Sequence, residues 1–297
     1  MPKDALEPWL RDPNPSVRAA VLPALRRAAP AEADALRDRW LTGKDPLLRA
    51  AALEDLPEPP ASLDALAQRI LADDELDTLQ GLIAGFERWK LAPERQLGLL
   101  RPFLKHKDWG QRFTAYQALL KLDPRTPWPA APAPAKEAQV QLKFAENLAR
   151  ESQPVRVRLT FSGKRTLVLR LDPANAPLNV ANFIRLARRR AFDGRQVGRV
   201  VPNFVVQVGS PFDTMDGGPG YTVRCENSLG WYGPGTVGMA LSGKDTGGSQ
   251  WFITLNATPH LTGRYTRLGD VEDPDRALAL LDQLELGARL ERVQVLR

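Results

Sequence analysis

Hydrophobic and polar residues alternate with different periods in the two halves of the chain. In residues 1–123 the apolar positions follow a helical spacing, and residues 15–25 (PSVRAAVLPAL) recur as residues 46–56 (PLLRAAALEDL), 31 positions further on. From residue 154 the period becomes two, with Val155, Val157 and Leu159 separated by arginines. The first half is therefore predicted to be helical and the second to be built from strands.

The helical half repeats its own pattern. Weaker copies begin near Leu79 and Arg112, which predicts about four helix pairs stacked as a solenoid across residues 1–123. Pro15 and Pro46 suit the first turn of a helix, where a missing N–H costs nothing. The pattern resembles HEAT-type repeats, although its period is shorter than their usual ~40 residues. Such a domain either presents a surface for substrate or partner proteins or serves as a spacer, and the sequence leaves both open.

A proline-rich stretch separates the two halves. Residues 123–135 read DPRTPWPAAPAPA, with five prolines, which excludes helix and favours an extended connector. The predicted domains are a helical-repeat domain at 1–123, a linker at 124–136 and a second domain at 137–297. Trp128, inside the linker, is expected to pack onto one of the domains, and residues 137–151 are expected to form a helix.

The second domain is predicted to be a closed antiparallel barrel. Two helices are expected at 178–190 and 275–284. Short apolar segments with turn signals between them favour about eight strands. The expected strands are 155–161, 167–171, 196–201, 204–210, 221–226, 236–241, 251–256, 265–271 and 290–296. The fold class is thus multidomain, an all-α solenoid followed by a β-barrel.

Charge and composition exclude several functions. The net charge is +6, and residues 151–297 carry 19 Lys and Arg against 14 Asp and Glu. The arginines at 185 and 188–190 are read as a solvated helix end, because no aromatic residues interleave with them as a nucleic-acid site would require. No apolar run approaches the ~20 residues of a membrane helix. No nucleic-acid or membrane partner is therefore expected.

The N-terminus and the single cysteine bear on the compartment. Residues 1–7 (MPKDALE) lack the basic and then apolar pattern of a signal peptide, so a cytoplasmic protein is expected, with a trimmed signal peptide as the alternative. Cys225 is the sole cysteine, which excludes an intramolecular disulfide.

Signals for cofactor or metal chemistry are weak. Residues 238–245 (GMALSGKD) nearly match a phosphate-binding loop, but Asp245 stands where Ser or Thr must hold Mg²⁺, and the flanks are strand-like. The chain contains two histidines, His106 and His260, too few for a histidine-based metal site or triad. Neither a cofactor nor a metal is expected.

An ordered set of motifs in the second half resembles the cyclophilins, which are peptidyl-prolyl cis/trans isomerases. No single motif is decisive, but their order and number across residues 154–297 are specific. The resemblance implies a barrel capped by two helices, isomerase activity without a cofactor, and X–Pro polypeptides as substrates. The motifs are APLNVANF (176–183), FDG (192–194), RVVPNF (199–204), QVG (207–209), GGPGY (217–221), GTVGMA (235–240), GSQWFI (248–253) and HLTGRY (260–265).

The resemblance also implies a role for each site residue. Arg199 would donate a hydrogen bond to the prolyl nitrogen in the twisted state, and Gln207 would hold the substrate carbonyl or Arg199 itself. The backbone of Leu241 would pair with the peptide, while Ala240 and Gln250 would line the neighbouring subsite. The proline ring would be surrounded by Phe204, Val205, Phe252 and Leu261, with His260 and Tyr265 at the rim.

Several positions depart from the pattern of the family. Gly198 stands where many members have His, Val205 replaces a commoner Met, and Leu268 replaces a Phe. These changes predict an active enzyme of modest rate that assists folding, with the helical domain recruiting substrate or partner. The alternative is a low-activity module that binds proline peptides within a scaffold or chaperone-like interaction protein.

Overall fold

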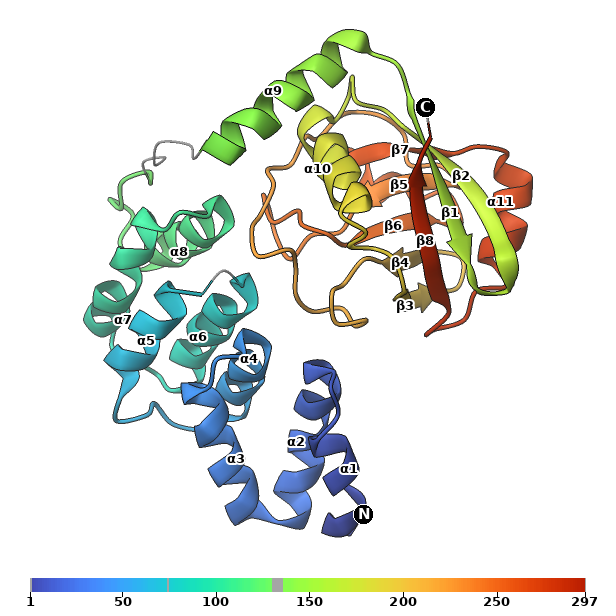
Figure 1. Ribbon diagram of the computed structural model, residues 1–297. Helices are drawn as coiled ribbons and strands as arrows, with labels where there is room; N and C mark the ends of the chain where they lie inside the picture. Colours follow the sequence, from blue (N-terminus) through green and yellow to red (C-terminus); the bar gives the residue numbers. More distant parts are fainter. Residues whose placement is uncertain (1, 74, 130–135, 297) are drawn as a thin grey trace. The chain divides into compact units, whose positions relative to one another are not determined.

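The protein is described by a computed structural model that covers residues 2–73, 75–129 and 136–296. The chain divides into two compact units, Met1–Pro132 and Ala133–Arg297, coloured blue to green and green to red in Figure 1. Each unit has its own apolar core. Of the predicted linker at 124–136, residues 130–135 lie outside the described residues.

The first unit is helical, as its periodicity predicted. Helices α2, α4, α6 and α8 begin 31, 30 and 33 residues apart and pack side by side, while α3 packs against α2 and α4. The assignment to the HEAT class stays a prediction. The helices are η1 (Lys3–Ala5), α1 (Glu7–Leu10), α2 (Pro15–Ala28), α3 (Pro30–Thr42), α4 (Pro46–Asp55), α5 (Leu63–Leu71), α6 (Leu76–Arg88), α7 (Pro93–Leu100), η2 (Arg101–Lys105) and α8 (Trp109–Leu122).

Polar side chains begin three of the packed helices. The side chains of Asn14, Asp45 and Asp108 accept hydrogen bonds from backbone N–H groups in the first turns of α2, α4 and α8. These bonds satisfy donors that a helix start leaves unpaired, and proline at the first position of α2 and α4 removes another.

An arginine in the first turn of these helices reaches back to the preceding loop. Arg18, Arg49 and Arg112 each donate to the backbone carbonyl six residues earlier. Arg18 also pairs with Asp45 of the next repeat at 3.2 Å, and Arg49 pairs in the same way with Asp73. The arginine that recurs in the sequence thus fixes its own loop, and in two repeats it also holds the repeat that follows.

Trp128 packs onto the helical unit, as expected. The centroid of its ring lies 5.0 Å from that of Tyr116, 5.6 Å from Trp109 and 6.2 Å from Phe113, all on α8. The chain therefore stays attached to α8 for several residues beyond the end of that helix.

The second unit is a closed barrel of eight antiparallel strands in the order β1-β2-β7-β5-β6-β4-β3-β8, as predicted. Helices α10 (Pro177–Arg188) and α11 (Pro274–Leu281) contribute to its core, and α9 (Lys136–Glu151) packs against α10 (Figure 1). Short η3 (Ser162–Lys164) and η4 (Pro259–Leu261) lie in turns. The strands are β1 (Val155–Phe161), β2 (Arg165–Leu171), β3 (Arg195–Val201), β4 (Val205–Val208), β5 (Thr236–Met239), β6 (Trp251–Thr254), β7 (Arg267–Val271) and β8 (Arg289–Val295).

The predicted strand at 221–226 is wrong. Only Val223 pairs in strand geometry, with Gly247. The backbone N–H groups of Cys225 and Glu226 instead donate to the side chains of Asp245 and Thr266. Side-chain acceptors distant in sequence thus replace the ladder, which an alternating pattern could not reveal.

Two arginines of the basic run on α10 have structural contacts. The guanidinium of Arg185 lies 4.6 Å from the ring centroid of Tyr221, and that of Arg188 lies 5.5 Å from Phe144 on α9. Cation–π packing of this kind holds neighbouring elements against the helix. Among the described helices, none has the length and apolar character needed to span a membrane.

Candidate functional site

The pairing of four strands places three of the predicted site residues in one row. Arg199 on β3 lies opposite Gln207 on β4, Gln207 lies opposite Phe252 on β6, and Phe252 lies opposite Gly238 on β5. Directly opposed residues of antiparallel strands project from the same face. Because Val206, Val208, Trp251 and Ile253 fill the barrel core, this row lies on the outer face.

An apolar cluster separate from the barrel core forms on that face. Its buried members are Val205, Phe252, Leu261 and Tyr232, and the first three are predicted to surround the proline ring. The ring of Tyr265 meets that of Phe252 edge-on at 5.9 Å. Val201, Phe204, Ala240 and Tyr265 are half-buried around the cluster.

Arg199 lies at the edge of this cluster. Its guanidinium carbon is 5.9 Å from the ring centroid of Phe204, and its side chain is partly exposed. Within the described part of the chain, the guanidinium makes no hydrogen bond or ion pair. A guanidinium keeps its charge at all ordinary pH values and offers five N–H donors, so these donors are available to a ligand.

Two glutamines form a network beside the row. Gln207 Nε2 donates to Gln250 Oε1 at 3.0 Å, so its amide binds Gln250 rather than Arg199. Gln250 Nε2 donates in turn to the carbonyls of Met215 and Gly217, at 2.9 and 3.0 Å. The network therefore ties the loop at 210–220 to the site and fixes the orientation of both amides.

The segment after β5 presents free backbone groups. Ala240 N donates to Gln250 O at 3.0 Å, whereas the backbone N–H and C=O of Leu241 have no partner among the described residues. The side chain of Leu241 packs against the barrel core. This geometry leaves the Leu241 backbone able to pair with an extended peptide.

The remaining predicted residue lies on the other side of Phe204. His260 is exposed on η4 and stacks on Phe204, with ring centroids 5.6 Å apart and planes 24° apart. The stack limits the freedom of Phe204 at the rim. The eleven predicted site residues therefore lie on β3, β4 and β6, in the turn between β3 and β4, and in the loops that follow β5 and β6.

Two departures from the family pattern have structural explanations. A Cβ added to Gly198 would lie 2.6 Å from the carbonyl oxygen of Thr214, so the loop at 210–220 leaves no room there for a side chain. Leu268 is fully buried within the barrel core and is not part of the cluster around Phe252. The smaller side chain at 268 therefore affects packing inside the barrel and not the cluster around Phe252.

The sequence did not indicate Tyr232. Its side chain is fully buried, and its ring stacks on Phe252 with centroids 6.1 Å apart and planes 28° apart. Its hydroxyl has no hydrogen-bond partner among the described protein groups, and burial raises the pKa of the phenol above its ordinary value. The neighbouring Trp231 is exposed, and nothing in a glycine-rich loop distinguishes two adjacent aromatic residues beforehand.

The site combines an apolar cluster, one guanidinium without a partner among the described residues, and free backbone groups. It contains no nucleophile with an activating base. No group of three or more His, Cys, Asp or Glu side chains suited to a metal occurs within residues 2–73, 75–129 and 136–296. An apolar ring flanked by peptide groups is the chemical class of ligand that fits these features. An extended peptide could pair with the free backbone groups beside this cluster.

Comparisons with known proteins identify the family. Residues 156–296 match the family described as cyclophilin type peptidyl-prolyl cis-trans isomerase/CLD. The chain is 40% identical over 132 residues to the peptidyl-prolyl cis-trans isomerase of Synechococcus elongatus. The alignment covers 44% of this chain and 90% of that protein. It is 48% identical over 103 residues to peptidyl-prolyl cis-trans isomerase B of Bacillus subtilis. That alignment covers 34% of this chain and 72% of the relative.

A solved cyclophilin type isomerase of Cryptosporidium parvum matches at 23% identity with a TM-score of 0.45, covering 48% of this chain and 98% of the other. The chain belongs to the cyclophilin-type peptidyl-prolyl cis-trans isomerases by virtue of its relatives at 40% and 48% identity. Apart from Val155, the eight-stranded barrel lies within the residues that match this family.

Proposed function

We propose that the protein accelerates rotation about X–Pro bonds in protein substrates during folding, that Arg199 is the central catalytic donor, and that the helical unit recruits the substrate or a partner. The catalytic role of Arg199 is supported by an unpaired guanidinium in the same row as Gln207 and Phe252. This is the observation that carries the proposal.

The reaction needs selective stabilisation of a twisted peptide bond. Partial double-bond character gives the X–Pro bond a barrier of ~18–20 kcal/mol. In the twisted state the prolyl nitrogen regains a lone pair that can accept a hydrogen bond. A hydrogen bond from Arg199 to this nitrogen would be strong only in the twisted state. Only an interaction that is stronger in the twisted state than in the planar states accelerates the reaction.

The surrounding residues would hold the substrate while the bond turns. Val205, Phe252 and Leu261 offer a buried apolar wall for the proline ring. The unpaired backbone of Leu241 would bind the residues on one side of the bond. The second N–H of Gln207 Nε2 would donate to a nearby carbonyl, and Gln250 would line the neighbouring subsite and hold the Gln207 amide in place. Fixing one side of the X–Pro bond lets the other side rotate.

The test is the cis-to-trans conversion of a short X–Pro peptide by the full chain. Arg199→Ala is expected to lower kcat/KM by about 10²–10³, the usual cost of removing one preorganised donor. Arg199→Lys should recover little of the lost kcat/KM, because an ammonium lacks the rigid fork of N–H donors that a guanidinium has. The matched control is Arg158→Ala, an exposed arginine on β1 of the same barrel, which should leave kcat/KM unchanged. Wild-type activity in a folded Arg199→Ala variant would refute the role of Arg199.

A second function is a low-activity proline-peptide binding module. Val205 at the pocket wall favours it, because a short branched side chain adapts less than methionine. Binding of an X–Pro peptide by the wild type, without any acceleration of its isomerisation, would support this alternative and exclude the catalytic proposal.

A further inference from the structure

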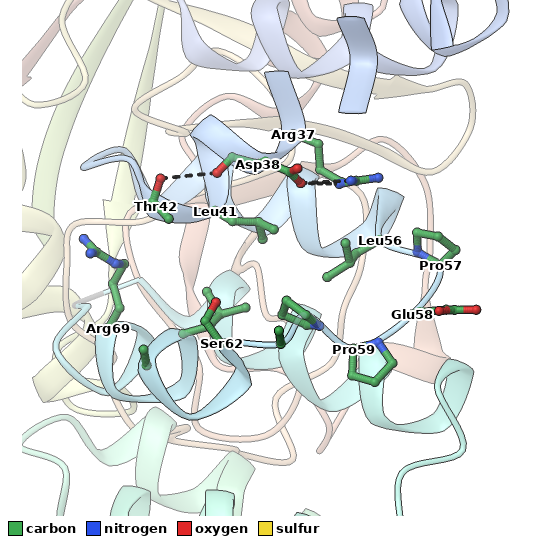
Figure 2. A pocket seen from close by; sticks show the side chains of 14 residues that line it. Arg37, Asp38, Leu41, Thr42, Leu56, Pro57, Glu58, Pro59, Ser62 and Arg69 are labelled. Carbon is green, nitrogen blue, oxygen red and sulfur yellow. Dashed lines mark hydrogen bonds and ion pairs between the residues drawn. The ribbon is translucent and has the colours of Figure 1, made fainter. Parts of the chain in front are cut away.

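Two open grooves are lined by described residues of the helical unit. The first, of about 600 Å³, lies between α3 and α5 and is closed on one side by residues 56–62 (Figure 2). The second, of about 860 Å³, lies between the end of α5 and the α7–η2 segment. Both belong to helices outside the packed row of α2, α4, α6 and α8.

The charged side chains that line the first groove favour no particular class of ligand. Its Arg37 is paired with Asp38 at 2.9 Å and with Asp34 at 2.7 Å, as the dashed lines to Asp38 in Figure 2 indicate. Leu41 and Leu56 point into it, and charges of both signs lie along its edges. This groove therefore gives no basis for naming a partner.

The second groove differs in its charge. Its small and apolar lining residues are Leu71, Ala72, Gly98 and Pro102, and its remaining described lining residues are Arg101, Lys105, His106 and Lys107. No acidic or aromatic side chain occurs among the described residues that line it. The groove thus combines small apolar residues with side chains of one sign.

Two of its cations are free to bind a ligand. Arg101 and Lys105 are exposed, and neither makes a hydrogen bond or ion pair within the described ranges. The charge of Arg101 contributes to the lowered pKa of Asp123, but the main cause is the hydrogen bonding and ion pairing of that carboxylate with Arg125. Arg101 and Lys105 therefore have no hydrogen-bonded or ion-paired carboxylate among the described residues, unlike Arg37 in the first groove.

From this arrangement we infer that the groove between α5 and the α7–η2 segment docks an acidic polypeptide segment. Carboxylates would pair with Arg101 and Lys105, and small apolar side chains between them would contact Leu71 and Pro102. Residues 1–123 carry 18 Lys and Arg against 19 Asp and Glu, so attraction here would come from the groove and not from net charge.

The lining favours protein over single-stranded nucleic acid as the occupant. Non-specific binding of single strands relies on aromatic side chains on which bases stack, and the described residues that line this groove include none. An acidic peptide needs only cations and small apolar residues beside them. This inference rests on the proposed recruiting role of the helical unit and specifies the chemistry of the recruited segment.

The experiment measures fluorescence anisotropy of a short, proline-free, dye-labelled peptide of Glu, Leu and Ser, titrated with the full chain. The same peptide with Gln in place of Glu is the ligand control. The Arg101→Glu, Lys105→Glu double variant is expected to bind the acidic peptide at least about tenfold more weakly, which corresponds to ~1.4 kcal/mol. Wild-type binding should weaken as salt is raised.

A matched double variant controls for net charge. The Arg11→Glu, Arg27→Glu double variant makes the same change in charge at two exposed positions, Arg11 just after α1 and Arg27 on α2. It should bind the acidic peptide as tightly as the wild type does. Equal weakening in both double variants, or none in the groove variant, would overturn the inference. So would tighter binding of a single-stranded oligonucleotide that depends on Arg101 and Lys105.

The outcome is separable from that of the catalytic proposal. Arg199→Ala should bind the acidic peptide normally, and the groove variant should isomerise a short X–Pro peptide at the wild-type rate. An acidic extension on that X–Pro peptide should lower its KM for the wild type but not for the groove variant. If the acidic peptide binds the groove but KM does not change, the groove docks a partner and the recruitment of substrate fails.

Discussion

Gly238 and Phe252 face one another across β5 and β6, and the phenyl ring occupies the space that a side chain at 238 would need. A Cβ built on Gly238 would lie 2.4 Å from Phe252 Cζ and 2.8 Å from the hydroxyl of Tyr232. Real Cβ atoms do not approach other atoms so closely. The absence of a side chain at 238 therefore sets where the ring of Phe252 lies in the pocket.

The Gly238→Ala variant is expected to displace Phe252 and lower kcat/KM roughly tenfold, with a loss of about 1–3 kcal/mol in stability from overpacking. Kinetics on an X–Pro peptide and urea denaturation measure the two effects. Gly98→Ala is the control, because a Cβ there meets nothing within 4 Å and lies in helix α7. A fully active Gly238→Ala variant would show that the position of Phe252 does not matter.

Tyr232 is expected to support Phe252 through its ring rather than its hydroxyl. Tyr232→Phe keeps the stack at 6.1 Å and removes a hydroxyl that no described protein group binds, so activity should be retained and stability should be equal or higher. Tyr232→Ala should lower stability by about 3–5 kcal/mol and raise KM, since it opens a cavity beneath the pocket. Loss of activity in Tyr232→Phe would instead assign a role to the hydroxyl.

The raised pKa of Tyr232 predicts a pH dependence at the alkaline end. In the unfolded chain this phenol ionises near its ordinary pKa of about 10, whereas burial keeps it protonated in the fold. The unfolded state then binds fewer protons, so stability falls as the pH rises above about 10 and is unaffected well below it. Urea denaturation of the wild type and Tyr232→Phe across this range should show a smaller decrease for the variant, and identical profiles would contradict the prediction.

Glu226 is expected to anchor the start of α10. Its two carboxylate oxygens accept from Leu178 N at 2.9 Å and from Asn179 N and Nδ2, both at 2.8 Å. Glu226→Gln would turn one acceptor into a donor and remove the negative charge at the helix start, costing about 1–3 kcal/mol. Thermal denaturation measures this, with Glu291→Gln at an exposed position of β8 as the control. Equal stability of the two variants would argue against the anchor.

The buried ion pair of the helical unit predicts an asymmetric mutational response. The side chain of Arg49 is 2% exposed and that of Asp73 is 13% exposed. Arg49→Met leaves the carboxylate unpaired and should destabilise the unit by about 3–5 kcal/mol, whereas adding Asp73→Asn should recover part of that loss. Urea denaturation tests this, and kcat/KM on a short X–Pro peptide should not change. A double variant less stable than Arg49→Met would exclude the explanation.

The hydrophobic periodicity of the sequence predicted much of the fold. Helical spacing in residues 1–123 and alternation from residue 154 reflect which faces of each element are buried, so both the helical region and the eight-stranded barrel could be predicted. The segment 221–226 could not, because its backbone groups bind side chains far along the chain. Alternation reports burial, and it does not report which partner satisfies a backbone N–H.

The order of the elements, the arginine repeated at the helix starts and the motifs around Arg199 and Phe252 can all be read from the sequence. That Gln207 binds Gln250, that Tyr232 stacks on Phe252 and that Gly198 has no room for a side chain can be seen only in the folded chain. These relationships depend on strand register and loop closure, which bring together atoms separated by up to 43 residues. Local patterns record burial and propensity, whereas such contacts exist only once the barrel has closed.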